Sequence, residues 1–292
     1  MRKRNSFSDI KFAALIHTME ISSHEAILPE SEIRAKPYIR GLRFSAGKAV
    51  YRINPNKYGV EITCLSDFKK VFSSILEELY ISNYKIKRLD VSINTIIPFC
   101  ELYKINSYVK ELYAIHIKED NSYHTNGDDF EKRSLKVTGA NYELEIYDKE
   151  KESKGKDTFK TRIEFRYKRL RKNQNIDDVL KEILSILDIL PSYISKLNQK
   201  KVAQLYDRHV TEQSPNYEGR TVNLIIFVSK YADFIYNIEI MKELYNRCCT
   251  GVFKNWLYRY RTNGKTLTLY TKKDIFTYIK QVKSSLKKYV TE

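Results

Sequence analysis

Hydrophobic and polar positions alternate with a period of two in two stretches near the middle of the chain, residues 142–148 and 162–167. This alternation predicts two β-strands, and the connector between them, rich in Lys, Gly, Asp and Ser, predicts a hairpin with a long loop. Every second side chain of a strand lies on the same face. The polar rows predicted in this way are Glu143, Glu145 and Tyr147, continued by Lys149, and Arg162, Glu164 and Arg166. A sheet face of carboxylates, a tyrosine and guanidiniums is not expected to lie in the hydrophobic core, and it suits the binding and chemistry of phosphate.

Upstream of this hairpin the pattern predicts a small mixed domain. Residues 22–48, punctuated by proline and glycine, are expected to be irregular. The other predicted elements are a strand over 9–21, a hairpin over 49–65 with its turn at N-P-N-K-Y-G, a helix over 67–80, a strand over 85–96 and a helix over 101–120. This order predicts an α+β fold in which residues 1–172 form an antiparallel sheet with helices on one face.

Beyond residue 172 the pattern becomes mostly helical, which predicts a second domain over residues 173–292. Residues 238–289 follow a helix–turn–helix–hairpin–helix pattern with R-T-N-G-K at the hairpin tip, which suits a winged-helix module for DNA binding. An ordinary helical cap or assembly surface with a solvated basic face is the open alternative. The basic residues assigned to DNA contact in this region are Lys254, Arg259, Arg261 and Lys265.

Charge and composition narrow the class of partner. The 292 residues include 52 Lys and Arg against 36 Asp and Glu, a formal net charge of +16. Such an excess favours a polyanion, because each phosphate neutralised by a cation releases counterions, although a basic protein without a nucleic-acid role stays open. Four cysteines without C-x-x-C spacing predict neither a zinc site nor a disulfide framework and fit a reducing cytoplasm. The chain shows no signal peptide, no apolar run that could span a bilayer and no P-loop glycine pattern.

Three short motifs resemble a known family. ELEIYDKEKE at residues 143–152, followed by TRIEFRYKRLRK at 161–172, resembles the I-Y-D-K … R-x-E region of rolling-circle replication initiators of small plasmids and filamentous phages. IKRLDVSIN at residues 86–94 is similar to their R-x-D-x-x-x-D strand, so the resemblance covers about residues 86–172. It implies a metal-dependent enzyme that nicks one strand at a replication origin and holds the new 5′ phosphate on a tyrosine.

The chain departs from that family at the position of the nucleophile. Many such initiators carry Y-x-G-S before the Y-D-K, whereas LKVTGA here places Val137 at the tyrosine position. Tyr142, which is near the motif, and Tyr193, which heads a Y-x-x-K segment, are therefore the two candidates, and Tyr206 heads a similar segment. Tyr147 belongs to the Y-D-K, which the resemblance does not make the nucleophile. Short matches of this kind also arise by chance among 23 tyrosines.

Two acidic residues stand within apolar strands. Asp90 and Glu164 would each be costly to bury unless paired with a cation or bound to a metal. Carboxylates on neighbouring strands suit Mg²⁺ or Mn²⁺, which would polarise the scissile phosphate. For Asp90 the alternative is an ion pair with Arg88 or Arg162. His17 could add one ligand or simply be packed, because the paired-histidine motif of many rolling-circle enzymes is absent.

Two principal hypotheses follow for the function. The first is a replication initiator that binds single- and double-stranded origin DNA, with a host helicase as a candidate partner and a homodimer as a candidate assembly. The second is a catalytically inactive relative that only binds DNA, and a third alternative is an RNA-binding protein that uses exposed tyrosines. The residues expected to contact DNA or phosphate in the sheet domain are Arg88, Lys149, Arg162 and Arg166.

Overall fold

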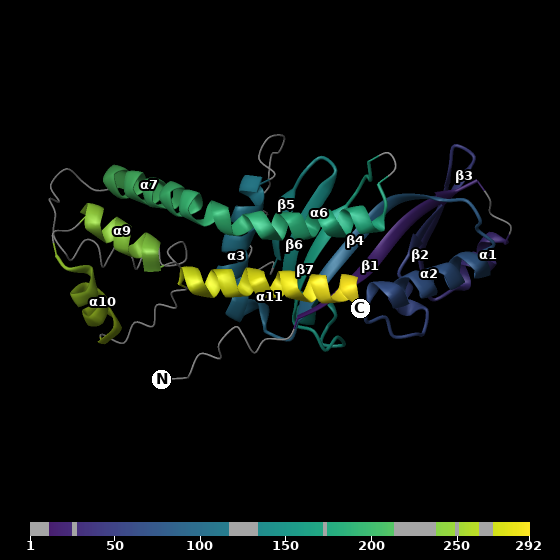
Figure 1. The fold of residues 1–292 in the computed structure, drawn as a ribbon, viewed down its shortest axis with the longest axis horizontal. Helices are drawn as coiled ribbons and strands as arrows, with labels where there is room; N and C mark the ends of the chain where they lie inside the picture. The colour runs from purple at the N-terminus through teal and green to yellow at the C-terminus, as the bar shows by residue number, and fades with distance from the viewer. Residues whose placement is uncertain are drawn as a thin grey trace.

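The computed structural model describes residues 12–24, 28–116, 134–171, 174–212, 238–248, 251–262 and 271–292, without the side chains of 116, 208–212, 256 and 259–262. Seven strands form one antiparallel sheet in the order β2-β3-β1-β4-β7-β6-β5 (Figure 1). The strands are β1 Phe12–Ser23, β2 Ile39–Ser45, β3 Lys48–Ile53, β4 Lys85–Thr95, β5 Ser134–Thr138, β6 Tyr142–Asp148 and β7 Thr161–Tyr167.

Helices cover one face of this sheet. The helices of the described residues are α1 Glu30–Ala35, η2 Pro55–Lys57, α2 Leu65–Glu78, α3 Phe99–His116, α5 Lys149–Glu152, α6 Ile176–Ile189, η4 Leu190–Tyr193, α7 Ile194–Glu212, α9 Ile238–Cys248, α10 Phe253–Thr262 and α11 Lys272–Thr291. Of these, α7, α9 and α10 extend beyond the sheet at one end of the molecule (Figure 1). α11 packs along β1 beside α6, and α3 packs on β5 and β6 (Figure 1). None of the described helices is long and apolar enough to cross a membrane.

Local sequence explains where the longer helices begin. Asn175 and Asp178 form a capping box at the start of α6, and Thr271 and Asp274 form another at the start of α11. Each box satisfies two backbone N–H groups that the first turn would otherwise leave without acceptors. Both helices then bury an apolar stripe, α11 against β1 and α6 against α11 and η4.

The predicted α+β class and the strands predicted over 85–96, 142–148 and 162–167 are confirmed, and so is the strand predicted over 9–21 from residue 12 onward, because residues 9–11 lie outside the described residues. The hairpin predicted over 49–65 is wrong, because β3 ends at Ile53 and the N-P-N-K-Y-G segment forms η2 and an irregular lead into α2. β3 pairs instead with β2, which lies in the stretch predicted to be irregular. The turn between them uses Ala46 and Gly47, whose φ angles of 50° and 71° suit a tight hairpin.

The hydrophobic core crosses residue 172, the predicted domain boundary. Tyr278 of α11 contacts the ring of Phe12 in β1, and the backbone N–H of Ile16 donates to the hydroxyl of Tyr289 at 3.4 Å. The same buried cluster includes side chains of β1, β4, α6 and α11. The last helix of the predicted winged-helix pattern therefore packs on the sheet, and the predicted hairpin at 263–270 lies outside the described residues.

Candidate functional site

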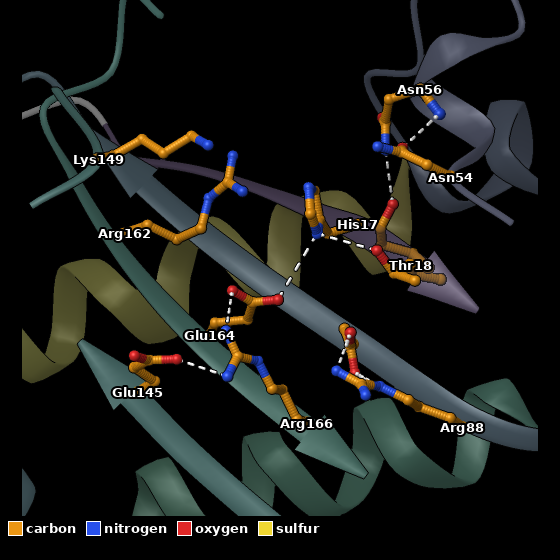
Figure 2. A network of polar contacts seen from close by, with 12 residues as sticks. His17, Thr18, Asn54, Asn56, Arg88, Glu145, Lys149, Arg162, Glu164 and Arg166 are labelled. Carbon is orange, nitrogen blue, oxygen red and sulfur yellow. Dashed lines mark hydrogen bonds and ion pairs between the residues drawn. The ribbon is translucent and has the colours of Figure 1, made fainter. Parts of the chain in front are cut away.

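The sheet face opposite the helices carries the polar side chains (Figure 2). The cross-strand pairs Glu143–Arg166, Glu145–Glu164 and Tyr147–Arg162 join β6 to β7, and Asp90–Arg166, Ser92–Glu164 and Asn94–Arg162 join β4 to β7. The two polar rows predicted from alternation are thus confirmed, and they lie side by side on one face. We call this surface, formed by β1, β4, β6 and β7, the polar face.

Arg166 links three carboxylates of the polar face. Its Nη1 lies 2.7 Å from Glu143 Oε1 and 2.5 Å from Glu145 Oε2, and its Nη2 lies 3.1 Å from Glu164 Oε2. Lys168 and Lys136 also contact Glu143, at 2.8 and 3.0 Å. Burial alone would raise the pKa of Glu143, but the hydrogen bonds from Lys168, Lys136 and Arg166 lower it to about 2.

This lowered pKa predicts a pH dependence of stability. A carboxylate with a folded-state pKa below its unfolded value stabilises the fold above the unfolded pKa and loses that contribution as the pH falls through the folded value. For Glu143 the stabilising contribution is lost over the pH range from its ordinary pKa of 4.5 down to about 2. At 1.36 kcal/mol per pKa unit, this contribution to the free energy of unfolding is roughly 3 kcal/mol. We expect Glu143→Gln to lower the free energy of unfolding at pH 7 and to approach wild type as the pH falls toward 2.

Urea unfolding at a series of pH values measures this difference, and Glu61→Gln, at an exposed carboxylate, is the matched control. A difference in the free energy of unfolding between Glu143→Gln and wild type that stayed constant down to pH 2 would contradict the lowered pKa of Glu143. Asp90 acts in the opposite direction, because burial raises its pKa more than Arg88 lowers it, so its ionisation costs stability as the pH rises.

Arg88 and Asp90 neutralise each other. The Arg88 Nε and Nη2 groups donate to the two oxygens of Asp90, both at 2.8 Å, and Asp90 is 1% exposed. This two-pronged contact confirms the alternative that Asp90 is an ion-pair partner of Arg88. The charge of Arg88 is thus already balanced by a carboxylate, and its contact with phosphate stays a prediction.

A β-bulge brings a histidine to the centre of the polar face. The β1–β4 register shifts between Ile16 and Thr18, so His17 is the extra residue. Its Nδ1 lies 3.1 Å from Thr18 Oγ1 and 3.5 Å from Glu164 Oε1, across the short side chain of Ser92 in β4 (Figure 2). Burial would raise the pKa of Glu164, but His17 and Arg166 hold it well below its ordinary value.

Arg162 is a buried cation of this face, and its hydrogen-bond partners are neutral. Its side chain is 4% exposed, its Nε donates to Asn94 Oδ1 at 2.6 Å, and its Nη1 donates to the Tyr147 hydroxyl at 3.5 Å. No carboxylate of the described residues lies within 4 Å of it, although a buried charge is normally paired. Figure 2 shows the end of Lys149 pointing toward the same guanidinium, and Lys149 itself contacts Glu152. The neutral partners of Arg162 leave it suited to bind an anion.

The structure brings one tyrosine of the described residues to Arg162 and Glu164, and it is Tyr147. Its hydroxyl donates to Glu164 Oε2 at 3.1 Å. Burial, and then the negative charge of Glu164, raises the pKa of Tyr147 above its ordinary value. The phenol is therefore neutral in the free protein.

The two tyrosines predicted as nucleophiles lie elsewhere. Tyr142 is an odd number of positions from Tyr147, so its ring faces the helices, 6.4 Å from that of Tyr113 and 6.1 Å from that of Tyr167. Tyr193 lies in η4 within the helical layer and packs against the core. Val137 is buried in β5, opposite Leu144, on the same apolar side. The structure does not bring either predicted tyrosine to the polar face.

The two predicted metal ligands already have other partners. Both oxygens of Asp90 accept from Arg88, and the oxygens of Glu164 face His17, Tyr147 and Arg166. Within the part of the chain that the structure describes, no group of three or more His, Cys, Asp or Glu side chains is placed to hold an ion. The arrangement does not fit a two-carboxylate metal centre, and Mg²⁺ or Mn²⁺ remains an expectation from the sequence.

The basic residues predicted near the C-terminus are separate from the polar face. Lys254 is exposed on α10, which lies at the end of the long axis opposite α1 and β3 and away from β1 and β4 (Figure 1). The side chains of Arg259 and Arg261, and the whole of Lys265, lie outside the described residues. Their assignment to duplex DNA stays a prediction.

Comparison with known proteins adds little to this geometry. No family profile matches the sequence, and no curated protein matches it. Among solved structures, the chain is similar to a rolling circle replication initiator protein from Geobacillus stearothermophilus, with 10% identity, coverage of 65% of this chain and 85% of that chain, and a TM-score of 0.32. A likeness at that TM-score carries no functional argument, so the polar face itself has to support any proposal.

Proposed function

We propose that this protein is a rolling-circle-type replication initiator that binds origin DNA on the polar face and nicks one strand there. The observation that carries the proposal is Arg162, a buried guanidinium with neutral partners beside a tyrosine hydroxyl and a carboxylate. A phosphodiester is an anion that would complete this charge arrangement, and Arg binds phosphate with two parallel N–H groups. Lys149 adds a second cation beside it.

Each of four residues of the polar face would have a separate role in the reaction. The Tyr147 oxygen attacks phosphorus, and the bond from phosphorus to the 3′ oxygen breaks. The phenol proton passes by way of Glu164 to His17, because the lowered pKa of Glu164 makes this carboxylate a relay that does not keep the proton. His17 would give the leaving oxygen a proton. Arg162 would stabilise the negative charge that develops on the phosphoryl oxygens. Because the pKa of Tyr147 is raised, its proton would leave only as the bond to phosphorus forms.

We expect Tyr147→Phe to abolish the covalent protein–DNA adduct, because it removes the attacking oxygen and leaves the ring in place. Tyr142→Phe is the matched control, since it makes the same change on the helix side of the same strand and should leave the adduct intact. The assay is nicking of a supercoiled plasmid with its own replicon, with Mn²⁺ and separately with EDTA, followed by denaturing gels and mass spectrometry of the adduct peptide. An adduct on another tyrosine, or no nicking in either condition, would contradict the proposal.

Val137, which stands where many of the initiators that the chain resembles carry their nucleophile and is buried on the apolar side of β5, favours one second candidate, a DNA-binding protein without nicking activity. In that case the polar face would hold a phosphate without cleaving its ester. Wild type would form no adduct, and Tyr147→Phe would bind DNA with unchanged affinity and salt dependence. The nicking assay and a fluorescence anisotropy titration on the same variants therefore separate the two functions.

A further inference from the structure

We infer that strand cleavage on the polar face needs no divalent metal ion, because the Arg162 guanidinium, held in place by Asn94, supplies the positive charge beside the scissile phosphate. This inference rests on the proposed function and specifies which cation acts there. The resemblance to rolling-circle initiators implies a metal-dependent enzyme, so this chain would stabilise the same reaction in a different way.

The two carboxylates predicted as metal ligands are each held by cationic groups of the protein itself. Both oxygens of Asp90 accept from Arg88 at 2.8 Å, and Asp90 is 1% exposed. Glu164 Oε2 lies 3.1 Å from Arg166 Nη2, and Glu164 Oε1 lies 3.5 Å from His17 Nδ1. A Mg²⁺ or Mn²⁺ ion would have to displace these groups, and its two charges would stand beside the guanidiniums that already neutralise the carboxylates.

Asn94 marks a departure from the initiator motif within β4. The R-x-D-x-x-x-D strand of that family ends in aspartate, whereas IKRLDVSIN carries Arg88, Asp90 and then Asn94. An amide brings no negative charge to a divalent ion, and the Asn94 Oδ1 atom already accepts from Arg162 Nε at 2.6 Å. An aspartate at this position would neutralise Arg162. The amide positions the guanidinium and leaves its full charge for a phosphate.

The side chains around Arg162 present donors, which attract the oxygens of an anion and repel a metal ion. Asn94 Nδ2 is buried and has no hydrogen-bond acceptor among the described residues, and the same is true of the Ser92 hydroxyl two positions before it. Arg162 can only donate, and Figure 2 shows the end of Lys149 pointing toward it. A phosphoryl oxygen would satisfy these buried donors, whereas a cation would leave them without an acceptor.

The first test compares nicking of a supercoiled plasmid with its own replicon in EDTA and in Mn²⁺ at matched ionic strength, by full-length protein stripped of metal ions. The two rates should agree within about twofold, whereas a site that depended on a Lewis acid would lose about a thousandfold in EDTA. Titration calorimetry with Mn²⁺ adds a readout besides cleavage, in which wild type and Glu164→Gln should give the same binding curve. Nicking that requires Mn²⁺, or Mn²⁺ binding that Glu164→Gln abolishes, would overturn the inference.

Asn94→Asp tests the role of the amide with little change of shape. The new carboxylate would neutralise Arg162, so cleavage in EDTA should fall by about 10- to 100-fold, less than the effect of removing a donor altogether. Mn²⁺ should not restore the rate, and urea unfolding should show that the fold is retained. Asn83→Asp, at an exposed position just before β4, is the matched control and should cleave at the wild-type rate. Faster Mn²⁺-dependent cleavage by Asn94→Asp than by wild type would show instead that the site uses a metal ion.

Failure of this inference is distinguishable from failure of the proposed function. Nicking in Mn²⁺ but not in EDTA, with the adduct on Tyr147, refutes metal independence and leaves the proposed function standing. Absence of nicking in both conditions refutes the proposed function itself. An adduct on Tyr147 that forms in EDTA at the rate seen in Mn²⁺ supports both.

Discussion

A chain that ends at residue 171 is expected to fail to fold into a soluble monomer. It would lose α6 and α11, each of which buries six side chains, and it would uncover the apolar face of β1 and β4. Native proteins are only marginally stable, so a fragment that exposes this apolar surface to water is expected to unfold or aggregate. Size-exclusion chromatography and thermal melting by circular dichroism measure the outcome.

Co-expression supplies the control for this truncation. Residues 172–292 provided as a second chain carry the missing helices and should restore part of the soluble protein. If the fragment ending at residue 171 instead melts cooperatively as a monomer, the core does not depend on α11. In that case a separate domain ending near residue 172 would be the correct description.

Arg162→Gln is expected to lower strand cleavage by about 10²- to 10³-fold, the usual effect of removing one donor from a developing oxyanion. Its effect on the free energy of unfolding should be small or favourable. The substitution removes a buried cation whose hydrogen-bond partners are neutral, so it leaves no carboxylate buried without a partner. Cleavage should thus fall strongly while the free energy of unfolding changes little or rises. Cleavage of an origin oligonucleotide and urea unfolding of the same preparation measure them.

Arg88→Gln is the matched comparison for Arg162→Gln. It makes the same change on the neighbouring strand but leaves Asp90 buried without its two hydrogen bonds, which should cost about 3–5 kcal/mol of stability. If Arg162→Gln lost as much stability as Arg88→Gln, the guanidinium would have a structural role. If Arg162→Gln cleaved DNA at the wild-type rate, Arg162 would not bind the scissile phosphate.

Alternation along the chain predicted most of the polar face correctly. Glu143, Glu145 and Tyr147 do share a side of β6, and Arg162 and Arg166 share the facing side of β7. The same rule already excluded Tyr142, since it precedes Glu143 by one position and must face the other way. Closeness in sequence was the weaker signal for the nucleophile, and the side of the strand was the stronger one.

The remaining features depend on contacts between distant segments. The bulge at His17 arises from the register of β1 on β4, which the sequence of one strand does not encode. The hairpin turn at Ala46 and Gly47 lacks the Asn-Gly or Asp-Gly signal that identifies such turns, whereas N-P-N-K-Y-G carries turn residues but leads into a helix. The apolar stripe of α11 predicted a buried face but not the surface that it covers.

The contact between Tyr289 and Ile16 joins residues 273 positions apart. Closing so long a loop is slow, because its entropy is lost before the contact forms, and a sheet built from distant strands adds to the delay. Until α11 docks, the apolar side of β1 is open to other chains, which is the condition under which folding intermediates aggregate. The yield of active protein should therefore depend on how quickly this one helix docks relative to encounters between unfinished molecules.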